Sequence, residues 1–247
     1  AKEILRQRDD IALALIDVVM ETPEAGLDLI NYIRNEMNNK IIRLVLRTGQ
    51  PSQEPEKHVI DLYDINDYKE KTELTAQKLY TLVRTSINQY GQHKELKDSR
   101  DAIYNKMTTS ELTGLPNRMK LNEYLDSEGD KSLILINIDD FSTINETQGF
   151  NVGDKLLQAF ATYLADFHSH GTRLFHIHAD IFSILCDKLD SKEIEKYIAS
   201  LKMSITNHSF KLGTLELQVT VSIGVAMHES GNLMQKAELA IREARNV

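Results

Sequence analysis

Three polar side chains with amide or carboxylate oxygens lie at the ends of predicted strands in the second half of the chain. Asn137 lies near the end of the apolar run 133–138 and Asp139 directly follows it; because side chains alternate along a strand, both are expected on the same side. Asp180 lies in the turn, residues 178–180, of a hairpin predicted between Phe175 and Cys186. Two of these side chains are carboxylates and Asn137 is a neutral amide, so the group carries two negative charges.

A second group of polar residues follows predicted strands in the first half. Asp17 ends the apolar run 13–16, Thr48 comes shortly after the run 41–46, and Lys71 lies further along. Ligands of open parallel sheets bind beyond the carboxyl ends of the strands, where these three side chains would converge. The simpler interpretation, which stays open, is that Asp17 and Thr48 are ordinary residues at strand ends.

The composition is that of a soluble globular protein. The chain has 247 residues, of which 41% are hydrophobic and 27% charged, enough for one large domain or two of ordinary size. A net charge of −8 argues against a general nucleic-acid surface, and no apolar run reaches the roughly 18–20 residues of a membrane span. The single cysteine excludes an internal disulfide and a thiolate metal cluster. These features predict a cytoplasmic protein.

In the first ninety residues, short strands alternate with helical segments. Strands are expected at 13–16, 41–46 and 59–63, and a helix at 26–38, which favours a parallel sheet with crossover helices. Apolar residues at helical spacing then predict a packing or dimerising helix over 72–90, and a polar seam predicts a charged helical connector over 91–107. An ordinary helix docked on its own domain is the open alternative.

The second half, from about Thr108, has a different order of elements. Helices are predicted at 119–125, 153–167, 191–208 and 232–245, and strands at 132–138, 173–178 and 181–186, with a strand pair near 210–226. This βαββαβ order is that of the ferredoxin-like palm of nucleotide cyclases and polymerases.

Four short motifs in this second half resemble those of one family. Residues 112–118 (LTGLPNR), 133–139 (LILINID), 178–182 (HADIF) and 220–226 (TVSIGVA) fall in the order and spacing of a GGDEF domain. Residues 108–247 are therefore similar to a diguanylate cyclase. The resemblance implies that two GTP molecules are joined into cyclic di-GMP, one bound by each half-site of a homodimer, with Mg²⁺ offsetting the triphosphate charge.

The resemblance also implies which residues bind the nucleotide. Asn145 and Asp154 match the residues that contact guanine, and a carboxylate can accept two hydrogen bonds from the guanine edge. Arg245 matches a basic residue that meets the phosphates. Two alternatives stay open: Asp154 could be a helix N-cap, and Arg245 an ordinary surface residue.

The metal and catalytic positions depart from the family pattern. Asn137 stands where the family has a metal-binding aspartate, and Ile181 where it has the catalytic acid, while Asp180 keeps the preceding carboxylate. The two glycines of the signature are His178 and Ala179, whose β-carbons would crowd the phosphates. The resemblance therefore predicts a degenerate domain with a weakened Mg²⁺ site.

Substitutes for the lost groups can be named. Asp139 could replace the metal-binding aspartate, and His178 could serve as a base or ligand because imidazole titrates near neutrality. His176 and His178 alternate with apolar residues, however, which favours packing or surface roles on a strand. The family's product-inhibition motif, Arg-x-x-Asp, aligns with residues 169–172 (SHGT), so that site is expected to be absent.

The first ninety residues resemble the latter two thirds of a response-regulator receiver, a doubly wound sheet. The resemblance implies that Asp17 is the phosphoacceptor, assisted by Thr48 and Lys71. A receiver also needs an acid pair after its first strand, and no such strand precedes Asp17. The chain is therefore expected to start inside the domain, and phosphorylation of Asp17 in this chain is not expected.

Three functions are open. The leading hypothesis is a non-catalytic module of cyclic-di-GMP signalling, with a partial receiver-like domain (1–90), a helical connector (91–107) and a degenerate GGDEF domain (108–247) that senses GTP or transmits the state of a dimer. The second is a slow diguanylate cyclase that uses Asp139 and Asp180. The third is a dimerisation or interaction platform without nucleotide. A sensor kinase and a following phosphodiesterase domain are the expected partners.

Overall fold

The computed structural model describes residues 1–22, 24–49, 56–127, 129–167, 171–187, 190–227 and 232–245. The chain divides into two compact units, Ala1–Ala102 and Ile103–Val247. None of the described helices combines the length and the apolar character that a membrane span requires.

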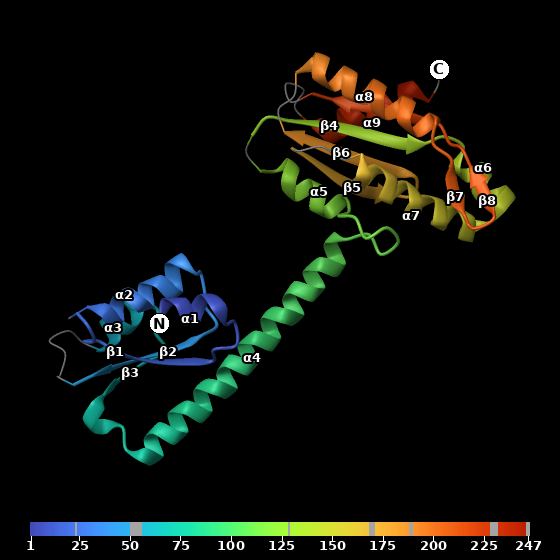
Figure 1. Cartoon of the computed structure of the whole chain (residues 1–247). Coiled ribbons are helices and arrows are strands. Elements are labelled where there is room, and N and C mark those ends of the chain that lie inside the picture. Colours follow the sequence, from blue (N-terminus) through green and yellow to red (C-terminus); the bar gives the residue numbers. More distant parts are fainter. Residues whose placement is uncertain are drawn as a thin grey trace. The chain divides into compact units, whose positions relative to one another are not determined.

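The first unit is built on three parallel strands in the order β1-β2-β3 (Figure 1). The strands are β1 (Leu13–Asp17), β2 (Arg43–Thr48) and β3 (Asp67–Glu70). The helical elements are α1 (Lys2–Gln7), α2 (Ala25–Asn31), which continues into the π-helical η1 (Tyr32–Glu36), α3 (Glu56–Tyr63) and the 3₁₀ turn η2 (Lys71–Glu73). The predicted strands near 13–16 and 41–46 are confirmed.

The prediction of a strand at 59–63 is wrong, because this segment belongs to helix α3. Val59 is buried and Ile60 and Tyr63 pack against the same core cluster, whereas Asp61 and Leu62 are exposed. Contacts at i, i+1 and i+4 are the period of a helix, so packing overrides the strand preference of the β-branched pair. The third strand is instead β3, which pairs with β2 in the order of the described sheet.

A close backbone approach holds α2 against the end of β1. The amide nitrogen of Gly26 donates to the carbonyl of Val18 at 3.1 Å. A β-carbon on Gly26 would lie 2.1 Å from the backbone oxygen of Asp17, so only glycine allows this distance. The start of α2 is thereby fixed beside the strand end that carries Asp17.

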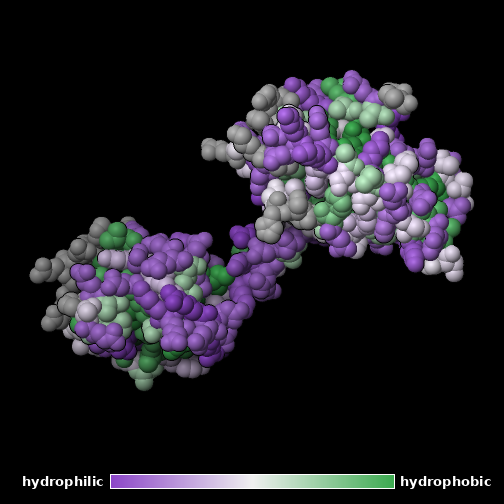
Figure 2. Space-filling view, turned by 45° about the horizontal axis from the view of Figure 1, so that its top comes forward, coloured by the Kyte–Doolittle hydropathy of each residue, from purple (hydrophilic) through white to green (hydrophobic). Residues whose placement is uncertain are grey.

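Helix α4 (Ala76–Thr108) is one continuous helix of 33 residues. The sequence predicted two segments divided at Gly91, but a β-carbon at Gly91 would meet nothing within 4 Å, and the helix runs through this exposed position. The visible surface of α4 is mostly hydrophilic (Figure 2). Near its middle, Gln89 accepts a hydrogen bond from Arg43 at 3.0 Å, which ties α4 to β2.

The second unit contains a four-stranded antiparallel sheet in the order β5-β6-β4-β9 (Figure 1). Its strands are β4 (Lys131–Ile138), β5 (Thr172–His178), β6 (Ile181–Asp187) and β9 (Val221–Ala226), with a separate small hairpin of β7 (Phe210–Leu212) and β8 (Leu215–Leu217). Its helices are α5 (Arg118–Leu125), α6 (Phe141–Gln148), α7 (Phe150–Asp166), α8 (Ser191–Thr206) and α9 (Leu233–Ala244). The predicted palm fold is confirmed.

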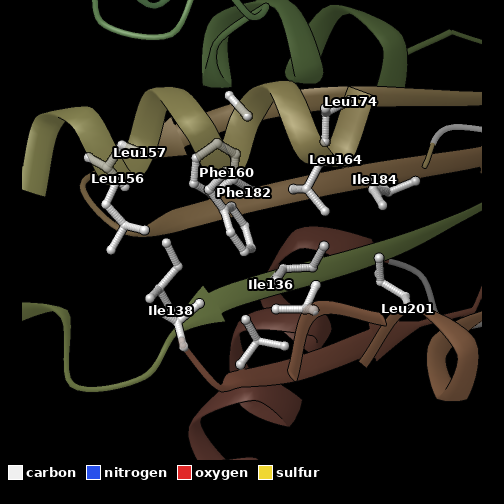
Figure 3. Close-up of a cluster of buried hydrophobic side chains, with 14 of the residues drawn as sticks. Ile136, Ile138, Leu156, Leu157, Phe160, Leu164, Leu174, Phe182, Ile184 and Leu201 are labelled. Atoms are coloured by element: carbon white, nitrogen blue, oxygen red, sulfur yellow. The ribbon is translucent and has the colours of Figure 1, made fainter. Parts of the chain in front are cut away.

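Both faces of this sheet are covered, which explains why β4 is buried along its whole length. In β4, β5 and β6, even-numbered residues such as Ile136 and Phe182 pack with α7 and α8 around Phe160 (Figure 3). Odd-numbered residues of these three strands, such as Leu135, pack with α5 and α9. Covering both faces converts a strand pattern from alternating to continuously apolar.

The segment between β4 and β5 differs from the prediction of one helix at 153–167. It forms two helices, α6 and α7, separated by Gly149 with φ +84°, a conformation that glycine adopts without strain. Because α7 begins at Phe150, Asp154 lies in the helix rather than at its N-cap. The capping interpretation of Asp154 is therefore wrong.

Candidate functional site

The carboxylate of Asp180 accepts a hydrogen bond from the side-chain amide of Asn137. Asn137 is 1% exposed near the end of β4, and its Nδ2 donates to Asp180 Oδ2 at 2.7 Å. A carboxylate only accepts, so the amide nitrogen must face it and the amide oxygen must point elsewhere. That oxygen, Oδ1, is buried without a partner among the described residues. A neutral amide therefore lies beside Asp180, the remaining acid of the turn at residues 178–180, which is called the signature turn below.

Asp139 is hydrogen-bonded on the side of β9, the neighbour of β4 opposite to β6. Its two carboxylate oxygens accept hydrogen bonds from the hydroxyls of Thr220 and Ser222, both at 2.7 Å, and its amide donates to the carbonyl of Thr220 at 3.0 Å. These partners precede or belong to β9, whereas Asp180 follows β5. Asp139 is therefore held by β9, and within the described residues no hydrogen bond joins it to Asn137 or Asp180.

The turn that replaces the glycines of the signature has an unusual backbone. Ala179 has φ +46°, in the left-handed region that costs a residue with a β-carbon about 1 kcal/mol or more. His178 is exposed beside it. Ile181 is half-buried and packs against the cluster under α5 and α9. The predicted turn at 178–180 is confirmed, and the side chain at the acid position is used for packing.

His176 packs in the strand, as was predicted, but it also has polar partners that were not predicted. Both ring nitrogens lie within hydrogen-bonding distance of partners: Nε2 is 2.9 Å from the carbonyl oxygen of Ala179, and Nδ1 is 2.9 Å from Ser110 Oγ. The ring stacks on Phe182 with centroids 4.6 Å apart. Burial lowers the pKa of His176 from its usual value, so the neutral ring is favoured. The alternation around His176 indicated packing but not these polar partners.

The predicted guanine-contacting residues lie on neighbouring helices. Asn145 is half-buried on α6 and Asp154 is exposed on α7. A β-carbon on Gly153 would lie 1.9 Å from Asn145 Oδ1, so the side chain of Asn145 rests directly on the backbone of α7. Neither Asn145 nor Asp154 has a side-chain hydrogen bond to another described residue. The role of Gly153 was missed, although it stands beside Asp154 in the stretch 149–154.

Two further predicted sites lie at the edges of the described structure. Arg245 follows the last residue of α9 and is exposed. Of the stretch aligned with the product-inhibition motif, residues 169 and 170 lie outside the described residues, and Thr172 begins β5.

The donors present do not fit a pair of Mg²⁺ ions. Asp180 is the single carboxylate at the end of the hairpin, and one of its oxygens already accepts the Asn137 amide. Both carboxylate oxygens of Asp139 already accept hydrogen bonds from hydroxyl groups. Among the residues that the structure describes, no three His, Cys, Asp or Glu side chains are grouped as a metal site. A two-metal site needs several charged oxygens with free lone pairs.

In the first unit, the structure brings Asp17 and Lys71 together. Lys71 Nζ lies 3.0 Å from Asp17 Oδ2, and Arg47 Nε lies 2.9 Å from Asp17 Oδ1. The hydrogen bond from Lys71, followed by that from Arg47, outweighs partial burial and lowers the pKa of Asp17. Thr48 ends the adjacent strand β2. Arg47 was missed, because it was interpreted only as the end of a strand, although the register pairs it with Asp17.

Curated proteins resemble different lengths of the chain. 3′3′-cGAMP-specific phosphodiesterase 2 of Vibrio cholerae is 60% identical over 90 residues, which are 36% of this chain and 17% of that protein. The response regulator PleD of Caulobacter vibrioides is 29% identical over 163 residues, 62% of this chain and 36% of PleD. The chain thus spans less than half the length of both curated relatives.

The fold of the second unit also occurs in solved structures. A diguanylate cyclase/phosphodiesterase from Caldicellulosiruptor saccharolyticus superposes with a TM-score of 0.53 at 26% identity, over 58% of this chain and 90% of that one. Residues 108–247, more than half of the chain, match the family model of the diguanylate cyclase GGDEF domain. With its antiparallel palm and its signature turn in place, the chain belongs to the GGDEF family of diguanylate cyclase domains.

Proposed function

We propose that this chain is a signalling module of cyclic-di-GMP pathways whose GGDEF domain binds a guanine nucleotide without turning it over. One observation carries the proposal: the amide of Asn137 donates to Asp180 at 2.7 Å, where an active cyclase would set carboxylates around cations. The adjacent acid position is Ile181, which packs in an apolar cluster. An amide and an isoleucine cannot supply the charge that phosphoryl transfer requires.

Recognition of the base is separable from this chemistry. Asn145 and Asp154 lie on α6 and α7, and within the described residues their side chains form no hydrogen bonds, so their donors and acceptors remain open to a ligand. The N1–H and amino edge of guanine offers two donors to a carboxylate. Adenine lacks that pattern, and a site built on such bonds discriminates strongly against it. Arg245 is assigned to the phosphates in this proposal.

The first unit is assigned as the input. Asp17 is held by two cations at the carboxyl end of a parallel sheet, the edge at which ligands of such sheets bind. In this proposal Asp17, Thr48 and Lys71 occupy the phosphoacceptor positions of a receiver-like domain within residues 1–90, although no strand followed by an acid pair precedes Asp17 and this chain itself is therefore not expected to be phosphorylated there. The 60% identity to a cyclic-dinucleotide phosphodiesterase over 90 residues supports a place in cyclic-dinucleotide signalling. The segment 91–107 connects it to the GGDEF domain, 108–247, and a homodimer is the expected assembly.

Calorimetry with GTP and ATP, together with an assay for cyclic di-GMP, tests the proposal. GTP should bind with release of heat, ATP should not, and no product should accumulate. Asp154→Ala should weaken GTP binding more than about tenfold, because losing a charge-assisted pair of hydrogen bonds costs on the order of 1.5–3 kcal/mol. Asp166→Ala, an equally exposed change on the same helix, is the matched control and should leave binding unchanged.

Each other outcome selects another function. Steady product formation that disappears in Asp180→Ala would identify an active cyclase. Absence of GTP binding at millimolar nucleotide, or equal binding of ATP, would remove the sensing role and leave a nucleotide-free interaction platform.

A further inference from the structure

The ring of His176 lies between two segments that are far apart in sequence. His176 is 6% exposed on β5. On one side its Nδ1 faces Ser110 Oγ at 2.9 Å and Thr113 Oγ1 at 3.2 Å, 66 and 63 residues earlier. On the other side its Nε2 faces the carbonyl of Ala179 at 2.9 Å. One imidazole thus joins the loop after α4 to the signature turn.

The partners determine which nitrogen carries the proton. The carbonyl of Ala179 can only accept, so Nε2 must be the donor. In the neutral ring, Nδ1 then has a lone pair, and the hydroxyls of Ser110 and Thr113 can turn to donate to it. The partners of the ring therefore fit one tautomer, in which Nε2 carries the proton. Stacking on Phe182 holds the orientation of the ring.

The loop at the other end of this link is itself tightly closed. It begins where α4 ends at Thr108, whose carbonyl accepts from the amide of Asn117 at 2.8 Å. The amide of Ser110 donates to the carbonyl of Leu115 at 2.8 Å, and the amide of His176 donates to the carbonyl of Pro116 at 2.9 Å. The loop thus follows the end of α4 and is anchored to β5 by both backbone and ring.

We propose that His176, as the neutral Nε2–H tautomer, is a positioning residue that transmits the state of the loop at the end of α4 to the turn bearing Asp180. The left-handed backbone of Ala179 is held in place by the hydrogen bond from Nε2 to its carbonyl. The next residue, Asp180, accepts the amide of Asn137. A displacement of Ser110 or Thr113 therefore reaches the candidate site through one side chain.

Two NMR measurements on the full chain test this inference, and neither depends on nucleotide binding. Long-range ¹H–¹⁵N spectra should show His176 with a protonated Nε2 and an unprotonated Nδ1. The amide of Ile138 donates to the carbonyl of Asp180 at 3.2 Å, so its hydrogen exchange reports on the turn. In the double variant Ser110→Ala/Thr113→Val, this exchange should accelerate at least tenfold, while that of Leu135 in the middle of β4 is unchanged.

Matched variants separate this role from general stability. Ser110→Thr keeps the hydroxyl and should retain slow exchange at Ile138. Thr162→Val removes a hydroxyl that bonds only within α7 in the described structure, and should have no effect. His176→Phe keeps an aromatic ring beside Phe182 and should accelerate exchange as the double variant does. A protonated Nδ1 in the neutral ring, or unchanged exchange at Ile138 in the double variant, would overturn the inference.

Discussion

Replacing the buried amide beside Asp180 by a carboxylate tests the central feature of the site. In Asn137→Asp, the introduced group would stand about as close to Asp180 as the amide does, 2.7 Å, at a position that is 1% exposed. Two charges at this distance repel by about 6 kcal/mol at an effective dielectric constant of about 20. The protein has a less costly alternative, which is to keep the introduced group protonated so that its O–H donates to Asp180.

The cost of that proton can be worked out from linkage. Holding a carboxyl group protonated costs about 1.4 kcal/mol for each pH unit above its unfolded pKa of about 3.9. The folded-state pKa of the introduced group is raised, so the penalty is absent below about pH 3.9 and grows as pH rises. We expect the variant to lose about 5 kcal/mol of unfolding free energy at pH 7.5 and about 1.5 kcal/mol at pH 5.

Urea unfolding of the full chain measures this effect, with the second unit followed through the amide signals of β4 and β6. Asn122→Asp makes the same chemical change at an exposed position of α5 and should cost less than about 0.5 kcal/mol at either pH. Millimolar Mg²⁺ should restore stability to Asn137→Asp and leave the unsubstituted chain unchanged, because only the variant has two acids side by side. Equal stability of variant and parent at pH 7.5 without Mg²⁺ would refute the assigned bond between Asn137 and Asp180.

Three further substitutions test other parts of the structure. Ala179→Gly should stabilise the second unit by up to about 1 kcal/mol, since glycine relieves the cost of φ +46°, and a thermal melt with no rise in Tm would contradict this. Gly153→Ala should displace the side chain of Asn145, with which its methyl would collide at 1.9 Å, and should weaken GTP binding at least fivefold by calorimetry. The pKa of Asp17 is lowered by Lys71 and then by Arg47, so its contribution to stability is complete above about pH 5 and is lost as pH falls below roughly 3.9. Acid titration should therefore destabilise the parent more steeply than Asp17→Asn, and parallel curves would show that these ion pairs contribute nothing.

Several features could be predicted from local sequence alone, for a physical reason. The apolar residues of 132–138 predicted a strand, and the structure has β4 there, buried along its whole length because both faces of the sheet are covered. The turn at 178–180 follows from two apolar strands that flank a polar interruption. The spacing of four motifs was enough to identify the family. The strand, the turn and each single motif are signals of a few neighbouring residues, and the family follows from the order in which the motifs occur along the chain.

The contacts that define the site depend on pairs far apart in the chain, and only the tertiary structure decided them. Asn137 and Asp180 are 43 residues apart, Arg47 and Asp17 are 30 apart, and His176 and Ser110 are 66 apart. Such pairs depend on strand register, which in the pairing of β5 with β6 is irregular between His176 and His178, directly before the turn. The helix at 56–63 was also decided by tertiary contacts, because its packing against the core follows a helical period although its local sequence favours a strand. The sequence determines which elements form and which side chains are available, whereas the register of distant strands determines which side chains meet.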